Sequence, residues 1–428
     1  MGFLSGEKLI VGYDLGNEHS QISFSRSGEG EVETLSQTAG AENYNIPTAL
    51  CKRDGVNQWF YGREAVRKGE EGQGILVDNL LALALDGEPV LIDGESFDPT
   101  ALLTLFVKRS LGMLNQAAAT DKIGGLMITC EILDQHVLDV LNRVVAGLRL
   151  KTDRIMFQSH KESYYNYMIH QPKELWAYQS LLFAYVGNCI KVYRMECNRR
   201  TSPVVAFIEE KAFPFPLWEP LPEEPDKRER RAGELDVGLL KIAREACEGV
   251  MAGSIFLIGE GFEQDWMKES LKYLCRNRRV FQGNNLFSKG ACFGMLERLE
   301  LSDAGKDYVF LGNDKLKANI GMKLLRQGEE SYYALLDAGV NWYEAFRELE
   351  FYLQDGNEIA VTVTPLTGKN GKVAQIVLDD LVGTAVRLRA RFSLEAENVL
   401  AVELEDLGLG EMRPSTGRIW KEKVKLYE

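Results

Sequence analysis

The feature that most constrains the fold of this chain is a strand–turn–strand pattern over residues 9–24. An apolar run of β-forming residues comes first, and polar and apolar residues then alternate from Gln21 to Phe24. In the turn, one residue separates Asp14 from Gly16. Glycine allows the backbone to approach a phosphate closely, and a carboxylate holds Mg²⁺ through its bound waters. The pattern therefore predicts a hairpin, either one that binds phosphate or a plain turn.

The same strand–turn–strand pattern occurs again later in the chain, where Gly187 and Asn188 form the turn. Its recurrence indicates two halves that are duplicated in structure rather than in sequence. A third segment reads as a buried strand that ends in Gly259 and Gly261. This glycine pair is not a dinucleotide-binding fingerprint, because the third glycine of that motif and the strand–helix–strand unit around it are missing from the sequence.

Two further stretches differ in character from these strands. Residues 213–231 are rich first in proline and then in charge, which predicts an exposed loop with a solvated charged face. A helix follows, with apolar residues at helical spacing from Leu235 to Val250. Over residues 301–428 strand-like alternation dominates, with turns between the alternating runs. This last region is predicted to be an all-β sandwich.

Composition narrows the classes of function. The net charge of −13 argues against a nucleic-acid partner and against binding to an anionic membrane. The chain has four histidines and seven scattered cysteines without a C-x-x-C pair, which argues against a zinc site and fits a reducing, cytoplasmic location. No apolar run is long enough to span a bilayer. Three arginines, Arg387, Arg389 and Arg391, share one strand face, which is either solvated or a site for an acidic partner.

The order of these segments resembles the actin, hexokinase and heat-shock ATPase superfamily, and within it the DnaK-type 70-kDa heat-shock proteins. There an Asp-x-Gly hairpin is the first of two phosphate clamps, and a Gly-x-Gly pair approaches the adenosine. The resemblance implies an α/β fold with two actin-like (ribonuclease H-like) lobes around a cleft in residues 1–300. Lobe I would cover residues 1–178 and lobe II residues 179–300. Residues 301–428 would then correspond to the all-β sandwich that binds substrate in those chaperones.

The resemblance also implies where a nucleotide would lie. ATP or ADP with Mg²⁺ is the implied cofactor, and Asp14 is the implied metal ligand. The residues carried over as cofactor-binding are Asp14, Gly16, Asn17, Gly187, Asn188, Gly259 and Gly261. Protein or peptide clients are the implied partners.

The second phosphate clamp departs from the family pattern, in which the strand ends in Asp-x-Gly-Gly-Gly-Thr. Ala184 stands at the position of the aspartate, and Val186 stands at the first glycine. Asn188 and Cys189 replace the third glycine and the threonine, while Gly187 is kept. The carboxylate is therefore lost, and a β-branched side chain occupies a position where the backbone should approach phosphate.

The other polar groups of an ATPase are also altered. Glu18 follows the first clamp, and a carboxylate that faces a polyphosphate repels it. Ser159 stands where the family has a water-orienting glutamate, although Glu162 lies close by in the sequence. Removing one such group commonly costs about a hundredfold or more in rate. We therefore expect little or no hydrolysis and assign no catalytic residue.

These observations favour a DnaK-like pseudo-ATPase that acts as a protein- or peptide-binding scaffold. One alternative is an active ATP-dependent chaperone with rearranged catalytic groups such as Glu162. Another is an actin-like filament protein, which the predicted C-terminal β-module disfavours. A sugar or acetate kinase has no substrate-recognition motif in its support.

Overall fold

The computed structural model describes most of the chain between residues 8 and 427. The described residues are 8–26, 31–38, 41–118, 122–152, 154–312, 314–326, 328–354, 356–366, 371–379, 381 and 385–427. The chain divides into two compact units, residues 1–310 and 311–428. The first unit mixes helices with strands, so the predicted α/β class is confirmed.

The first sheet of unit 1 is organised by the predicted N-terminal hairpin. Its strands are β1 (Leu9–Leu15), β2 (His19–Arg26), β3 (Glu33–Thr34), β4 (Ile46–Pro47), β10 (Ile123–Cys130) and β11 (Ile155–Ser159). They lie in the order β11-β10-β1-β2-β3, and β4 pairs with β2. β1 and β2 are antiparallel, whereas β10 is parallel to β1 and β11 is parallel to β10.

Both faces of β1 are covered, which explains why its sequence is apolar almost throughout. On one face Tyr13 shares a hydrogen bond of 2.7 Å with Ser110 in α3 (Pro99–Gly112). On the other face Gly12 meets α9 (Leu286–Leu299), where a Cβ on Gly12 would lie 2.2 Å from the backbone nitrogen of Cys292. Successive residues of a strand face opposite sides of the sheet, so Gly12 faces α9 and its neighbour Tyr13 faces α3.

The second sheet of unit 1 repeats the order and the directions of the five strands β11-β10-β1-β2-β3, and it has a sixth strand at one edge. Its strands are β12 (Gln179–Val186), β13 (Cys189–Asn198), β14 (Val204–Pro214), β15 (Ala252–Ile258), β16 (Arg279–Gln282) and β17 (Tyr308–Phe310). They lie in the order β16-β15-β12-β13-β14-β17. The antiparallel pair β12–β13 corresponds to β1–β2, and the parallel neighbours β15 and β16 correspond to β10 and β11.

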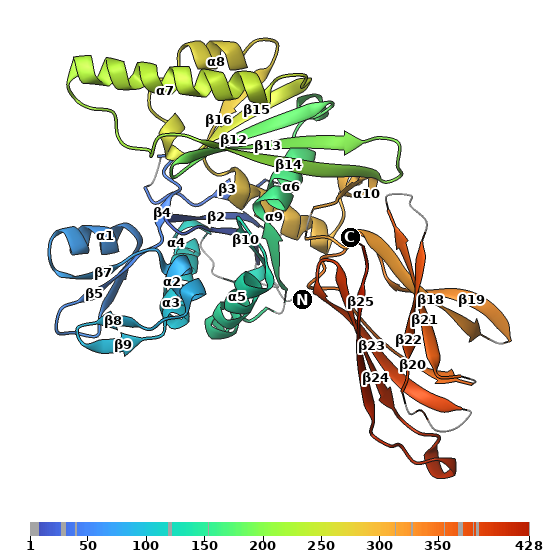
Figure 1. Cartoon of the computed structure of the whole chain (residues 1–428). Helices are drawn as coiled ribbons and strands as arrows, with labels where there is room; N and C mark the ends of the chain where they lie inside the picture. The colour runs from blue at the N-terminus through green and yellow to red at the C-terminus, as the bar shows by residue number, and fades with distance from the viewer. Residues whose placement is uncertain are drawn as a thin grey trace, which may run out of the picture. The chain divides into compact units, whose positions relative to one another are not determined.

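Helices cover the second sheet on both faces (Figure 1). α7 (Pro225–Ala246) and α8 (Glu269–Leu274) pack on one face, where Leu239 and Ile242 join a core with Leu181 and Phe183. α6 (His160–Ile169) contributes to the core on the other face. α6 and α9 also cross each other closely, because Gly290 of α9 brings the two backbones together.

The prediction of a loop over residues 213–231 is wrong for its charged part, because residues 225–231 form the first turns of α7. Pro225 occupies the first turn of the helix, where its missing N–H group has no cost. The charges that suggested a solvated loop instead pair along the helix, with Lys227 beside Glu224 at 2.6 Å and Arg231 beside Glu234 at 3.9 Å.

The other elements of unit 1 are short. The strands are β5 (Leu50–Arg53), β6 (Trp59–Tyr61), β7 (Gly74–Val77), β8 (Val90–Ile92) and β9 (Glu95–Phe97). The helices are α1 (Gly62–Glu70), α2 (Leu80–Asp86), α4 (Leu114–Ala118), α5 (Gln135–Leu148) and α10 (Asp303–Asp307), with 3-10 turns η1 (Lys173–Leu175) and η2 (Glu260–Phe262). Among the described helices, none combines the length and apolar character needed to cross a bilayer.

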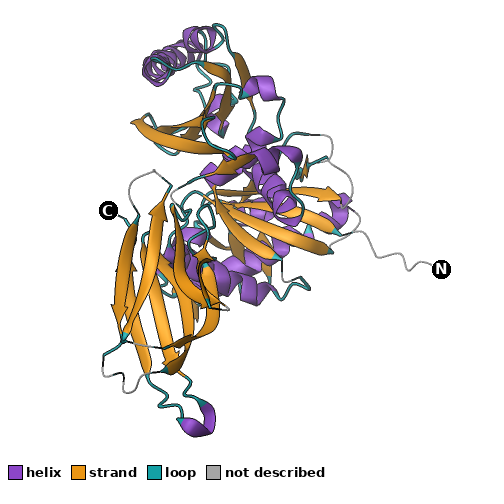
Figure 2. Cartoon of the chain, turned by 90° about the vertical axis from the view of Figure 1, so that its right-hand side faces the viewer, coloured by secondary structure: helices purple, strands orange, loops and turns teal. Residues whose placement is uncertain are grey.

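Unit 2 consists of two antiparallel sheets in its described residues (Figure 2). One has the order β19-β18-β21-β22, with β18 (Ala318–Arg326), β19 (Glu329–Leu336), β21 (Glu358–Pro365) and β22 (Lys372–Val377). The other has the order β20-β23-β24-β25, with β20 (Phe346–Leu353), β23 (Val386–Ala396), β24 (Val399–Asp406) and β25 (Ile419–Lys425), and the turn η3 spans Gly410–Met412. Buried and less buried residues alternate along β21, β23 and β24, as expected for strands that bury one face.

The arginine face of β23 is occupied by carboxylates of the neighbouring strands. Arg389 pairs with Glu350 on β20 at 3.1 Å and with Glu405 on β24 at 3.0 Å. Arg391 makes the same kind of double contact, and Arg387 also reaches Glu350. These side-chain hydrogen bonds lower the pKa of Glu350. The arginines therefore have acidic partners within their own sheet, and this favours the solvated face over a site for an acidic ligand.

These ion pairs between the arginines of β23 and the glutamates of its neighbouring strands predict a contribution to stability that depends on salt concentration. Replacing Arg389 by glutamine should lower the urea midpoint of unit 2 slightly, because these pairs are exposed and in water such pairs contribute little. The loss should shrink as NaCl is raised, since salt screens exposed charges. A loss that is large and independent of salt would contradict this account. Arg326→Gln, at the exposed end of β18 in the other sheet, is the control substitution.

Candidate functional site

The predicted metal ligand Asp14 is held by a histidine. Asp14 lies near the end of β1, and its Oδ1 is 2.8 Å from Nε2 of His160, the first residue of α6. The imidazole ring stacks on Phe287 of α9, with ring centroids 3.9 Å apart and planes within 10°. Both paired side chains are only about 15% exposed. A metal ion at Asp14 would therefore compete with a contact already made by the protein.

The other two residues of the first clamp maintain the local fold. A Cβ on Gly16 would lie 2.3 Å from the carbonyl oxygen of His19, so the turn itself requires glycine. The side chain of Asn17 bonds to Asn79 at 2.8 Å and accepts a hydrogen bond from the backbone N–H of Ala82 at 3.0 Å. Asn17 therefore supports the start of α2 with the groups that were predicted to bind a nucleotide.

The second hairpin turn is tied to the segment that follows β14. The carbonyl oxygen of Asn188 accepts a hydrogen bond from the backbone N–H of Phe215 at 2.9 Å. That of Gly187 accepts one from Trp218 at 3.4 Å. Gly187 has φ +52°, which explains the glycine, and nothing would obstruct a Cβ there. Ala184, at the position of the missing carboxylate, is buried in the core.

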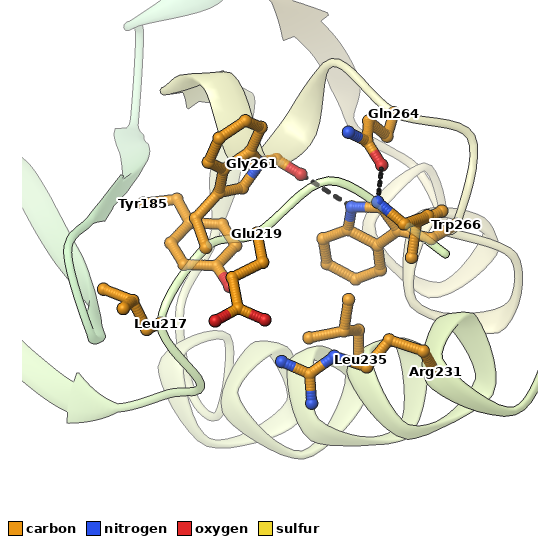
Figure 3. A pocket seen from close by; sticks show the side chains of 10 residues that line it. Tyr185, Leu217, Glu219, Arg231, Leu235, Gly261, Gln264 and Trp266 are labelled. Carbon is orange, nitrogen blue, oxygen red and sulfur yellow. Dashed lines mark hydrogen bonds between the residues drawn. The ribbon is translucent and has the colours of Figure 1, made fainter. Parts of the chain in front are cut away.

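The glycine pair after β15 accommodates the protein's own aromatic rings (Figure 3). Gly259 has φ +109°, and a Cβ there would lie 2.5 Å from the carbonyl oxygen of Tyr185. A Cβ on Gly261 would lie 2.1 Å from the Tyr185 ring and 2.5 Å from that of Trp218. Trp266 closes this site by donating a hydrogen bond of 2.6 Å to the Gly261 carbonyl oxygen. The pocket around Gly261 leaves no space for a water-sized molecule.

The structure brings the predicted segments together through side chains that were not predicted. His19, which begins β2, has its Nε2 3.7 Å from Oε1 of Glu260, between the two glycines. Asn45 donates a hydrogen bond of 2.7 Å to the same oxygen. The first hairpin therefore meets the glycine pair, and Tyr185 joins the glycine pair to the second hairpin.

Two lysines connect the first sheet and its following helix to the second sheet. Lys191 of β13 lies opposite Ala184 in the hairpin and forms an ion pair with Glu131, which follows β10. Lys161 of α6 pairs with Glu210 of β14 at 3.0 Å. We use the name polar junction for four contacts, namely His160–Asp14, His19–Glu260, Lys191–Glu131 and Lys161–Glu210.

Sequence reasoning found one of the eight residues of this junction. It singled out Asp14 but none of its partners. One signal was available in the sequence, since Glu131 lies where the resemblance would place a Pro-Ala pair, and such a departure marks a changed environment. Lys191 had a second signal, because it faces Ala184, the site of the lost carboxylate.

The junction offers little means for catalysis. Within the described ranges, no group of three or more His, Cys, Asp or Glu residues is placed to hold a metal ion. Burial raises the pKa of the Cys130 and Cys292 thiols far above neutrality, so they stay protonated and unreactive. Glu162 is buried in the first turn of α6, and its carboxylate lies 3.8 Å from Arg298 of α9, while His160 rather than Glu162 contacts Asp14.

Comparison with known families divides the chain near the boundary of its two compact units. Residues 31–313 match the sequence model described as the C-terminal part of a family of unknown function, DUF5716. Residues 315–426 match a domain of unknown function, DUF8552. No curated protein matches the chain. Since the first match covers more than half of the residues, the chain belongs to the DUF5716 family.

Proposed function

We propose that this protein is a DnaK-like pseudo-ATPase that acts as a protein- or peptide-binding scaffold. Two sheets that share the order of five strands within unit 1 support an actin-like pair of lobes around a cleft, and the two sheets of unit 2 support a β-sandwich. The observation that carries the proposal is the polar junction. Its side chains bind one another at the place where the resemblance would put Mg²⁺ and the phosphates of a nucleotide.

The charges of the junction disfavour a polyphosphate. Each lysine and histidine of the junction already has a carboxylate partner, so a nucleotide would have to displace Asp14 from His160 or Glu131 from Lys191. Displacement would leave carboxylates close to the incoming phosphates, and like charges at short range repel. The pocket at Gly261 is filled by the rings of Tyr185 and Trp218, so it would leave no room for the base of a nucleotide.

The crossing of α6 and α9 favours a rigid scaffold over a nucleotide-driven hinge. Gln158 donates hydrogen bonds to Ser163 at 2.6 Å and to the carbonyl oxygen of Gly290 at 3.3 Å. Ser163 in turn donates to Thr129 of β10 at 2.7 Å. A movement of one helix against the other would break this buried network, and each buried polar group left unpaired costs about 1–3 kcal/mol.

Calorimetry with Mg-ATP and Mg-ADP tests the proposal. We expect no saturable binding below about 1 mM and no phosphate release above background. Asp14→Asn is the matched control, because turnover that persists unchanged in this variant comes from a contaminating enzyme. Micromolar binding accompanied by turnover that Asp14→Asn abolishes would overturn the pseudo-ATPase and support the active chaperone. Sedimentation should be the same with and without nucleotide, and nucleotide-dependent pelleting would support the filament alternative.

A further inference from the structure

The outward face of α7 carries a groove of about 610 Å³ that the polar junction does not involve. It is lined by side chains at helical spacing along α7 and by one tyrosine of α8, namely Val237, Leu240, Lys241, Arg244, Glu245, Glu248 and Tyr273. The opposite face of α7 is buried on the second sheet. The residues of α7 in the groove, Val237 to Glu245, span just over two turns, a length of about 12 Å, and Glu248 follows the end of the helix.

The floor of the groove is apolar and open to solvent. Val237 is 70% exposed, although it lies in the middle of a 22-residue helix. Leu240 and Tyr273 are half-buried beside it. An exposed apolar stripe of this kind on an ordered helix is a common feature of sites that bind a partner helix.

The groove carries an excess of positive charge, because one of its two carboxylates, Glu245, is paired with Lys211. Lys241 and Arg244 lie on α7, and the guanidinium groups of Arg276 and Arg278 lie 5.8 and 5.7 Å from the centre of the Tyr273 ring. Within the part of the chain that the structure describes, none of these four cations forms an ion pair with a carboxylate. The arginines of β23 show the contrast, because each of them is neutralised by its own sheet.

We propose that this groove binds an acidic amphipathic helix of a partner protein. Apolar side chains at i, i+3 or i+4, and i+7 of that helix would contact the floor, while its flanking Asp and Glu residues would pair with the four cations. The apolar floor and the net charge of −13 favour such a peptide over a nucleic acid with its continuous phosphates. The inference rests on the scaffold role proposed above, but its site is separate from the junction.

Fluorescence anisotropy with the full chain tests the groove. The probe is a labelled 16-residue helical peptide with leucines on one face and glutamates elsewhere, and a version with lysine in place of glutamate is the charge-reversed peptide. We expect the acidic peptide to bind, the lysine peptide not to bind, and binding to weaken as salt is raised. Lys241→Glu with Arg244→Glu should weaken binding at least about tenfold.

The matched control is Arg228→Glu with Arg230→Glu, which makes the same charge change on α7 outside the groove. This control should change the affinity by less than about twofold. Equal weakening by both double variants, no binding by the wild type, or tighter binding of a single-stranded 16-nucleotide RNA would each overturn the proposal. If the wild type binds no peptide and shows no Mg-ATP turnover, the groove proposal alone is rejected. If the wild type shows Mg-ATP turnover that Asp14→Asn abolishes, the scaffold role is rejected.

Discussion

Gly290→Ala is expected to destabilise unit 1 by about 2–3 kcal/mol, because it adds a methyl group where two helix backbones touch. A Cβ on Gly290 would lie 1.9 Å from the carbonyl oxygen of Ser163 and 3.0 Å from its Cα. Backbone atoms cannot rotate away as a side chain can, so α6 and α9 must separate. Urea unfolding measures the loss, and amide exchange in α6 and α9 shows whether it lies at the crossing.

Gly233→Ala is the matched control for this prediction. Gly233 also lies in a helix, α7, but nothing within 4 Å would meet its Cβ. Alanine there should stabilise the helix by about 0.5–1 kcal/mol, since glycine is the poorer helix former. If Gly290→Ala were as harmless as Gly233→Ala, the close crossing of α6 and α9 would be wrong, and with it the rigidity on which the scaffold role depends.

Asp236→Ala is expected to cost about 3 kcal/mol near neutral pH, because the carboxylate of Asp236 holds the start of α8. It accepts hydrogen bonds from the backbone N–H groups of Lys268, Glu269 and Ser270 at 2.9–3.0 Å. The Ser270 hydroxyl adds a further bond. Removing the carboxylate would leave the N–H groups of a helix end without their partner.

The pH dependence of this loss follows from the pKa of Asp236. Burial raises that pKa, but the bonds from Ser270 and its neighbours outweigh burial and lower it below the ordinary 3.8. The carboxylate therefore stabilises the fold at pH values above about 4, and its contribution is lost as the pH falls through the folded-state pKa. The difference in urea midpoint between wild type and Asp236→Ala should shrink in the same acidic range.

Glu234→Ala is the control for Asp236→Ala. Glu234 lies on the same helix with its side chain 61% exposed, and its loss should change stability by less than about 0.5 kcal/mol at any pH. A difference between wild type and Asp236→Ala that stayed constant down to pH 2 would contradict the role of the ionised carboxylate. The Asp236 variant should also weaken peptide binding in the groove, because Tyr273 lies on α8.

The hairpins were predictable because their signals are local. Strand alternation and a turn glycine are properties of neighbouring residues, and they placed β1–β2 and β12–β13 correctly. The charged segment after Pro225 was assigned wrongly for a related reason. Its composition suited an exposed loop, but proline in a first helical turn and pairs such as Lys227–Glu224 suit a helix start as well.

The partners of the candidate site were not predictable from local patterns. His160 is 146 residues from Asp14, and Glu260 is 215 residues from Asn45. No periodicity connects such residues, because their meeting depends on how the two sheets of unit 1 pack. The same limit applies to the groove, whose Tyr273 and α7 residues come from different helices.

The sequence by itself determined the two hairpins and the turn at Gly187, since backbone conformation and residue identity are local properties. Only the tertiary structure decided that Asp14 is bound to His160 and that Gly259 and Gly261 lie against Tyr185. The physical reason is that a glycine or a carboxylate suits a ligand and a neighbouring side chain equally well, and packing between distant segments selects the occupant.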